Sequence, residues 1–417
     1  MLDYFINLST NRVIKLLCII LFFTVIIQLI LSSNQVLKKY GFKNYINSQD
    51  FTAYYTAAQM LKYGAGNDLY DINKQEYWQK QFVSKFSSSK NFRPFINPPF
   101  VALFYLPFTF LSLNISYLIW FIVNLVILFN ICKIFLEKFL QNLNSIKIFT
   151  FTLLILSYLP VFYTLISGQI SFILLFSFLM VRKDFLTNNK IKTGLWLSIL
   201  FLKPQYIILP LLFFIFRKEY KIVSVTAFIG GFFSLVSFLL VGHLGIEKYL
   251  HFLASILSWQ NTNTVVPALE YSWRGFMQLI VQKNDIESIF IYWLLGIMIL
   301  ILLLLYSWKD KARKKIAVFD FQWSIIIIGI ILITPYISGQ DLSILLLPAA
   351  LIYYWSRQVK SMKNFHKLVF VLIMTGYFVP IISDYFAYNF HIQLQVIYMA
   401  FLLMSLLFIQ KNYAKDF

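Results

Sequence analysis

The chain has 417 residues, of which 59% are hydrophobic and only 13% are charged, and its mean hydropathy is +0.72. A typical soluble domain is roughly 45–50% apolar and about 25% charged, so this composition excludes a soluble enzyme, a disordered chain and a disulfide scaffold. The net charge of +19 would suggest a nucleic-acid partner in a soluble protein. In a chain this apolar, the cations instead report membrane topology, and no nucleic-acid partner is expected.

The apolar runs predict an all-α polytopic membrane protein, built as a single integral membrane domain over residues 1–417. The first run, 13–32, is about 20 residues long, which is enough to cross roughly 30 Å of hydrocarbon as a helix. Further spans are predicted over 115–136, 148–166, 170–182, 192–202, 205–216, 221–242, 287–307, 322–337, 342–356, 367–383 and 392–410. The total is about 12 transmembrane helices.

Lys and Arg residues set the predicted orientation, because short loops rich in these residues stay in the cytoplasm. Most of the 36 Lys and Arg residues fall in the two termini and in five predicted loops: 133–147, 182–192, 217–221, 309–315 and 357–367. We therefore expect the termini and these loops to be cytoplasmic. The remaining loops are expected on the outer side.

Segment 33–98 is predicted to be a long first extracytoplasmic loop, and loops of this length are usually functional. Apolar residues at helical spacing predict an amphipathic helix within it: Phe51, Tyr54, Tyr55, Ala58 and Leu61. A second, polar helix is predicted around 73–84. Prolines 98 and 99 then break the chain, and 99–113 is predicted to be a re-entrant or interfacial helix.

Polar residues stand at six places along the predicted outer edge of the membrane, where such groups are costly and are functional candidates. They are Asp50, Asn97, Gly168-Gln169, Lys203-Pro204-Gln205, Ser272-Trp273-Arg274-Gly275 and Gly339-Gln340-Asp341. Because all six fall on the same predicted side, the sequence indicates one outward-facing site. The four histidines show no ligand spacing, and no metal site is predicted.

Each of these groups also has a purely structural interpretation. Asp50 directly precedes the amphipathic helix and could be its N-cap. Lys203 could be an interfacial lysine whose charged end reaches the headgroups, although Pro204 breaks the helix beside it. The two Gly-Gln pairs could be ordinary turns, and Arg274 could simply pair with Glu270.

The stretch Asp50-Phe51-x-x-Tyr54-Tyr55-x-Ala57-Ala58, followed by Gly64 and Leu69-Tyr70-Asp71, resembles the opening signature of glycosyltransferase family 87. Further similar motifs follow in family order: Asn97-Pro98-Pro99 with Leu106-Pro107, Gly168-Gln169, Leu202-Lys203-Pro204-Gln205, Ser272-Trp273-Arg274-Gly275, and Pro335-Tyr336 through Asp341-Leu342. The resemblance covers about residues 50–348. Asn97 departs from it, since family members usually carry an aromatic residue before the two prolines.

The resemblance implies a GT-C-type helical bundle that acts as a membrane glycosyltransferase, a hexosyltransferase with mannose as the expected sugar. It implies a polyprenyl-phosphate sugar as the donor and a lipid- or glycan-linked acceptor. The site would lie at the outer face of the cytoplasmic (plasma) membrane, and transfer would invert the anomeric centre. No cofactor or metal is implied, and the oligomeric state is left open.

Transfer from such a donor needs a carboxylate that takes a proton from the acceptor hydroxyl, and a cation that stabilises the leaving phosphate. The resemblance implies Asp50 as this base, and we assign the phosphate to Lys203, with Arg274 as a second candidate. The expected sugar- or acceptor-binding residues are Tyr54, Tyr55, Gln169, Gln205, Gln340 and Asp341.

Two other functions fit a chain with many spans, broken helices and an outward lysine. One is a transporter or flippase of a lipid-linked or anionic substrate, although transporters usually repeat their broken segments in corresponding halves. The other is an envelope polysaccharide polymerase or ligase. Release of free polyprenyl phosphate from a donor lipid would distinguish a glycosyltransferase from a transporter.

Overall fold

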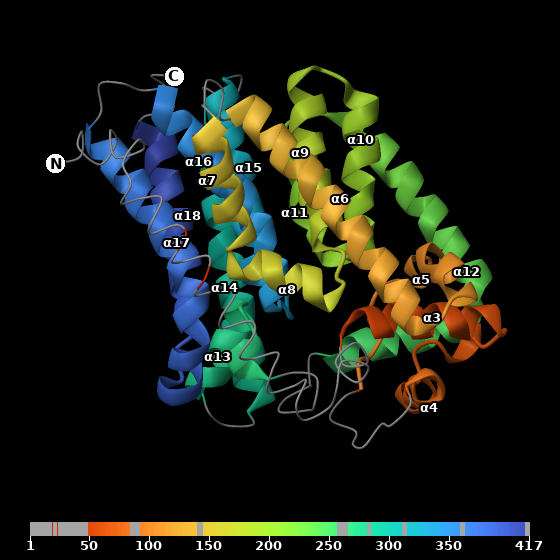
Figure 1. The fold of residues 1–417 in the computed structure, drawn as a ribbon. Coiled ribbons are helices and arrows are strands. Elements are labelled where there is room, and N and C mark those ends of the chain that lie inside the picture. Colours follow the sequence, from red (N-terminus) through yellow and green to blue (C-terminus); the bar gives the residue numbers. More distant parts are fainter. Residues whose placement is uncertain are drawn as a thin grey trace.

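The computed structural model covers residues 1–417, and the structure describes residues 49–83, 92–139, 145–256, 266–281, 285–310, 315–358 and 363–412, together with residues 19 and 23. Every regular element in these ranges is a helix (Figure 1), which confirms the all-α prediction. The first predicted span, 13–32, lies outside the described residues except at positions 19 and 23. The largest buried apolar cluster runs from Phe51 to Ile409, so the described helices share one core.

Six helices in the described ranges are long and apolar enough to cross a membrane, which confirms a multi-pass membrane protein. They are α6 (Leu113–Phe139), α12 (Tyr220–Ile256), α14 (Ile286–Trp308), α15 (Ile316–Ile333), α17 (Lys363–Phe390) and α18 (Leu394–Asn412). A seventh span is formed if α8 (Leu159–Ser167) and α9 (Ser171–Leu186), bent by 120°, count as one. The predicted total of about 12 is not confirmed, because other helices are too short: α7 (Ser145–Leu156), α10 (Lys190–Ser198), α11 (Ile208–Phe216) and α16 (Leu346–Gln358).

Three interruptions of the helices come together inside the bundle, between α8 and α9, between α10 and α11, and between α15 and α16. The second and third contain the 3₁₀ helices η5 (Ile199–Leu202), η6 (Pro204–Tyr206) and η8 (Gly339–Leu345). Lys203 has an extended backbone (φ −131°, ψ 92°), because Pro204 disfavours the helical conformation for the residue before it. The polar residues at these interruptions therefore lie on segments whose backbone is not α-helical.

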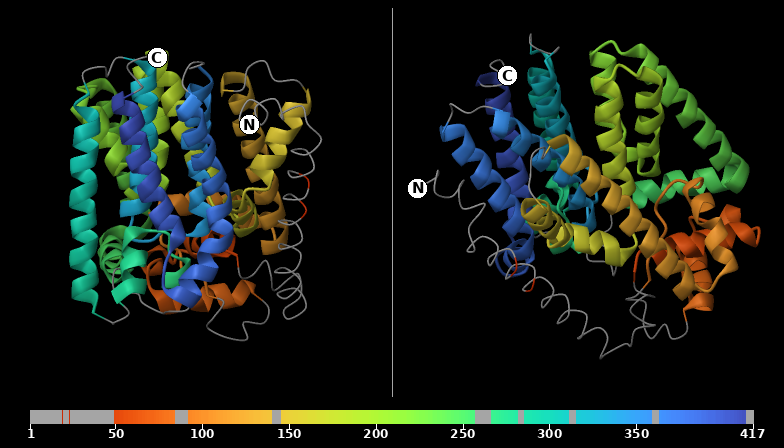
Figure 2. Two further views of the ribbon diagram at one scale, coloured as in Figure 1. Left: turned by 90° about the vertical axis from the view of Figure 1, so that its left-hand side faces the viewer. Right: turned by 45° about the horizontal axis from the view of Figure 1, so that its top comes forward.

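The long loop of the sequence folds into α3 (Phe51–Lys62), η2 (Gly66–Asp68) and α4 (Ile72–Phe82), close to the two predicted helices. Figures 1 and 2 place α3 and α4, with α13 (Trp273–Val281), at the end of the bundle opposite the C-terminus. The prediction of a helix here is confirmed, whereas its amphipathic character is not confirmed, since its first ten residues are all buried. Packing against α4, α5, η4 and α6 encloses it on every side.

The segment predicted to be re-entrant or interfacial contains α5 (Val101–Tyr105) and η4 (Leu106–Phe110). Each comprises five residues, so together they reach only about half the length of a crossing helix. Both pack against α3. This length favours a segment that does not cross, and its place relative to the membrane stays a prediction.

Helix α12 bends at Gly242, where the sequence predicted the end of a span. Gly242 has φ 63° and ψ −175°, a conformation open to glycine at little cost. Beyond the bend, at the end of the bundle that carries α3 and α4 (Figure 1), the rings of Tyr249 and Phe252 pack against Tyr70. The contact of α12 with η2 is close: a Cβ on Gly66 would lie 2.2 Å from the carbonyl oxygen of Leu240.

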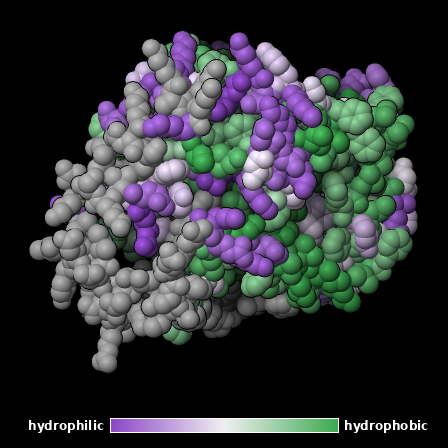
Figure 3. All heavy atoms as spheres, turned by 90° about the horizontal axis from the view of Figure 1, so that it is seen from above, coloured by the Kyte–Doolittle hydropathy of each residue, from purple (hydrophilic) through white to green (hydrophobic). Residues whose placement is uncertain are grey.

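The helix ends that border the predicted cytoplasmic loops lie together at the end of the bundle that carries the C-terminus (Figure 1). Figure 3, which looks down on this end, shows hydrophilic side chains gathered across it and hydrophobic side chains along its flank. Just inside, Arg182 makes two hydrogen bonds of 2.6 Å to the buried carboxylate of Asp320, to which Trp355 Nε1 also donates. That this end faces the cytoplasm stays a prediction.

Candidate active site

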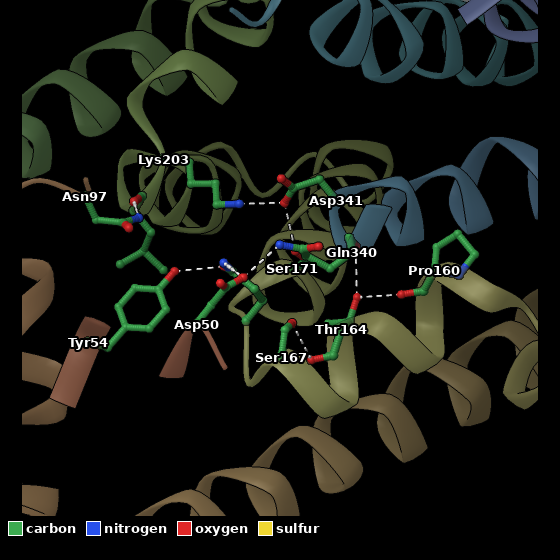
Figure 4. Close-up of polar contacts among 12 residues, drawn as sticks. Asp50, Tyr54, Asn97, Pro160, Thr164, Ser167, Ser171, Lys203, Gln340 and Asp341 are labelled. Carbon is green, nitrogen blue, oxygen red and sulfur yellow. Dashed lines mark hydrogen bonds and ion pairs between the residues drawn. The ribbon is translucent and has the colours of Figure 1, made fainter. Parts of the chain in front are cut away.

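Asp50 lies where the interrupted helices meet the start of α3 (Figure 4). Its Oδ2 accepts hydrogen bonds from Gln169 Nε2 at 2.8 Å and from Gln340 Nε2 at 2.9 Å. Its Oδ1 lies 3.9 Å from Arg93 Nε, and its side chain is 26% exposed. One carboxylate oxygen is thus held by two amides from different interruptions, and the other is bound by neither amide.

The N-cap interpretation of Asp50 is wrong. Asp50 does occupy the N-cap position of α3, but its side chain makes no capping hydrogen bond. A capping residue typically has a β-region backbone, whereas Asp50 already has φ −64° and ψ −26°. The carboxylate therefore bonds to Gln169 and Gln340 and not to the first turn of the helix.

Tyr54 sets the direction in which the Gln169 amide points. Its hydroxyl donates to Gln169 Oε1 at 2.8 Å, so the NH₂ group of Gln169 is turned toward Asp50. The ring stacks on Tyr105 with centroids 4.6 Å apart. Burial, with the charges of Asp50 and Asp341 adding to it, raises the pKa of Tyr54 well above its usual value. Tyr54 therefore remains a hydrogen-bond donor.

Gly168 brings Gln169 up to α3. It has φ +66°, and a Cβ there would lie 2.8 Å from the Cβ of Phe51. Its carbonyl accepts a hydrogen bond from Trp120 Nε1 at 2.8 Å, which fixes the turn. Glycine combines this backbone with such a close approach at little cost, and it ends α8 in the way helices commonly end. What distinguishes this turn is that it brings Gln169 to Asp50.

Lys203 is held in a buried ion pair with Asp341. Its Nζ lies 2.5 Å from Asp341 Oδ1, which also accepts from Ser171 Oγ at 2.9 Å. The Lys203 side chain is 11% exposed and that of Asp341 5% exposed. Asn97 Nδ2 donates to the carbonyl of Leu202 at 2.8 Å and so fixes the backbone next to Lys203. These contacts exclude the interpretation of Lys203 as a lysine that reaches the headgroups.

Arg274 belongs to a second buried pair. Its Nη1 lies 3.6 Å from Glu270 Oε2 and donates to the carbonyl of Pro335 at 3.3 Å. Burial raises the pKa of Glu270 to about 8, although the charge of Arg274 acts in the opposite direction. Burial also lowers the pKa of Arg274. The pair thus fixes the chain at Pro335, on the way to η8.

The remaining sequence candidates do not join the contacts around Asp50. The hydroxyl of Tyr55 donates to the carbonyl of Leu111 at 2.8 Å and accepts from Gln59 Nε2 at 2.9 Å. Gln205 is half-buried on η6, and no hydrogen bond links it to Asp50 among the described contacts. The described ranges contain no group of three or more His, Cys, Asp or Glu side chains that could hold a metal ion.

Two site residues were missed by reasoning from the sequence. Arg93 stands beside Asp50, and its position just before Pro94 and close to the Asn-Pro-Pro motif was an available signal. Ser171 reaches Asp341 from 170 positions away, and no local pattern distinguishes it from other serines near a turn.

No curated protein and no solved structure matches the chain significantly. The sequence profile of glycosyltransferase family 87 matches residues 95–335, which is more than half of the chain. The match includes Asn97, Gln169, Lys203 and Arg274, whereas Asp50 precedes it. The first two interruptions of the helices lie within the matched region, and the third, which carries Gln340 and Asp341, follows it. Because the match covers more than half of the chain, the chain belongs to glycosyltransferase family 87.

Proposed function

We propose that the protein transfers a hexose, with mannose as the expected sugar, from a polyprenyl-phosphate donor to a lipid- or glycan-linked acceptor. The reaction would take place at the outer face of the cytoplasmic membrane. The observation that carries this proposal is the setting of Asp50, a partly exposed carboxylate with one oxygen fixed by two amides. Family membership supports glycosyl transfer as the reaction.

Asp50 is the proposed general base. As the acceptor oxygen forms its bond to C1 of the sugar, its proton passes to Asp50, and the bond from C1 to the phosphate oxygen breaks. The electron pair leaves with the polyprenyl phosphate, and attack from the opposite face inverts C1. Since Gln169 and Gln340 both bind Oδ2, Oδ1 is the oxygen proposed to receive the proton.

Lys203 and Arg274 are the cations that the sequence proposes for the leaving phosphate. In the structure each already faces a carboxylate, Asp341 for Lys203 and Glu270 for Arg274. Lys203 would therefore have to leave Asp341 or share its charge when the donor binds. A fixed positive charge lowers the activation barrier strongly when it lies where negative charge develops in the transition state, here on the leaving phosphate.

The polar residues nearest to Asp50 are proposed to orient the sugar or the acceptor. Tyr54, Gln169 and Gln340 already form one hydrogen-bonded chain with Asp50. Asp341 adjoins this chain through Gln340. Tyr55 and Gln205 are proposed for the same role from the sequence, and neither joins this chain among the described contacts.

Purified protein given a donor lipid with a labelled sugar tests this function. We expect free polyprenyl phosphate and glycosylated acceptor to form in equal amounts. In Asp50→Asn, transfer should fall by about 10²-fold or more, as for loss of a general base, while thermal stability stays near that of the wild type. If Asp50→Asn is fully active, Asp50 is not the general base. If the intact donor lipid moves across the membrane of vesicles that contain the protein and is not cleaved, the protein is a transporter.

A further inference from the structure

Arg93 differs in its exposure from Lys203 and Arg274, the two cations that the sequence proposes for the phosphate. The Lys203 side chain is 11% exposed and that of Arg274 3%, and each faces a buried carboxylate. The Arg93 side chain is 35% exposed, and its Nε lies 3.9 Å from Asp50 Oδ1. This distance is too long for a hydrogen bond, so the guanidinium lies beside the base without a hydrogen bond from Nε to it.

Two glutamines on α4 hold the backbone of Arg93 in place. Gln79 accepts from the Arg93 N–H at 3.0 Å and donates to the Arg93 carbonyl at 3.0 Å. One helical turn earlier, Gln75 does the same for Phe95, at 2.7 Å and 3.3 Å. Both glutamines are buried. Each side-chain amide thus imitates the paired hydrogen bonds of a neighbouring strand.

This arrangement directs Arg93 toward the site. In an extended segment, side chains two residues apart point to the same side, so Arg93 and Phe95 share one side. The ring of Phe95 packs edge-on against Tyr54, with centroids 6.0 Å apart. Tyr54 in turn is bonded to Gln169, which holds Asp50. Because both buried amides are hydrogen-bonded to this segment, they hold it in place without leaving a polar group unpaired.

We infer that Arg93, held by Gln79 and Gln75, binds the phosphate of the lipid donor. This inference rests on the proposed function and assigns the phosphate to a residue other than Lys203 and Arg274. A guanidinium offers paired N–H groups that match phosphate oxygens. A phosphate bound to Arg93 would lie close to Asp50, because the two side chains are neighbours. The proposed reaction requires this, since the phosphate is attached to the C1 atom that is attacked beside Asp50. The buried Lys203–Asp341 pair then supports the site without changing partners.

Direct binding separates this inference from the proposed function. Purified protein in detergent is titrated with undecaprenyl phosphate and, in parallel, with undecaprenol, which has the same tail without the phosphate. The variants are Arg93→Gln, Arg93→Lys, Gln79→Leu and Lys203→Gln. Lys80→Gln is the matched control. Lys80 is an exposed cation on α4, next to Gln79, and it forms an ion pair with Glu76 on the same helix.

We expect Arg93→Gln to weaken undecaprenyl phosphate binding by about tenfold to a hundredfold, the usual range for lost charged hydrogen bonds. Undecaprenol binding should not change. Arg93→Lys should retain part of the affinity, Gln79→Leu should lose part of it, and Lys80→Gln should match the wild type. Arg93→Lys also serves if Arg93→Gln does not fold.

Two results would overturn the inference. If Arg93→Gln binds undecaprenyl phosphate like the wild type, the phosphate lies elsewhere. A loss of this binding in Lys203→Gln alone, with undecaprenol binding unchanged, would then place the phosphate on Lys203. If the wild type does not distinguish undecaprenyl phosphate from undecaprenol, the polyprenyl-phosphate donor itself is wrong. The first result leaves the proposed function standing, whereas the second removes it.

Discussion

The ion pair of Lys203 with Asp341 is nearly buried, so a single substitution in it can lower both activity and stability. Lys203 and Asp341 are bonded at 2.5 Å and are nearly buried. Removing either partner leaves the other charge without compensation in a medium that solvates it poorly. The thermal stability of each single variant must therefore be measured together with its activity, so that unfolding is distinguished from a defect in catalysis.

The Lys203–Asp341 pair can be tested with a double variant. Lys203→Gln should destabilise the protein by about 3–5 kcal/mol, because it leaves a buried carboxylate unpaired. Lys203→Met with Asp341→Leu should recover most of that stability, since no unpaired charge remains. Thermal unfolding in detergent measures both. If the double variant is stable and transfers sugar at the wild-type rate, the pair is only structural.

Glu270 predicts a pH dependence of stability. Burial raises its pKa to about 8 in the folded protein, against about 4.3 in an unfolded chain. Between these values the folded state holds the proton more tightly, so stability should fall as the pH rises from about 4.3 to about 8. Unfolding measured across this range should show the fall, and Glu270→Gln should flatten it. An unchanged slope in Glu270→Gln would assign the dependence to other groups.

At the scale of the elements, short breaks in the helices place the site residues. Gly168 and Lys203 lie only a few residues before α9 and α11, and η8 leads directly into α16. The backbone at the site is therefore anchored to these three helices. A small change of backbone at one break should therefore move a side chain that touches Asp50. Sites supported by helices hold their geometry better than sites on long loops.

Gly168→Ala tests this dependence. An alanine at φ +66° costs about 1–2 kcal/mol, and its Cβ would press against Phe51, the residue after Asp50. We expect a lower unfolding temperature and loss of transfer together. Gly231→Ala in α12 is the control, since no atom lies within 4 Å of its Cβ position, and it should be neutral or stabilising. If Gly168→Ala is active and stable, the geometry of this turn does not determine the activity of the site.

At the scale of the whole molecule, the two ends of the bundle differ in chemistry. One end carries the proposed site with α3 and α4, and the other carries the C-terminus and the helix ends next to the basic loops (Figure 1). Positive loops remain in the cytoplasm, so the site end is predicted to face outward. A donor with a phosphate headgroup would then be met at the outer membrane surface.

Cysteine labelling in whole cells tests this orientation. Single cysteines at Lys80 on α4 and at Lys218 between α11 and α12 replace exposed side chains at opposite ends. In a background without Cys18 and Cys132, a reagent that does not cross membranes should label position 80 and spare position 218 until the cells are opened. If position 218 is labelled in intact cells and position 80 is not, the orientation is the reverse of the predicted one.

Much of the fold could be predicted because the signals are local. Gly242 ends a predicted span at the residue where α12 bends, and Pro204 fixes the extended backbone of Lys203. Glycine acts on its own backbone and proline on its own backbone and that of the residue before it, so both effects depend little on distant residues. The burial of α3 was not predictable in this way, because the residues that cover it come from α5, η4 and α6.

By itself the sequence determined that this protein is a helical membrane protein, where its helices break and which polar residues stand at the breaks. Composition and backbone preference suffice for that, since both act over a few neighbouring residues. Only the tertiary structure decided the partners: Asp50 with Gln169 and Gln340, 119 and 290 positions away, and Lys203 with Asp341, 138 positions away. Such contacts depend on how distant helices pack, and a hydrogen bond extends only about 3 Å.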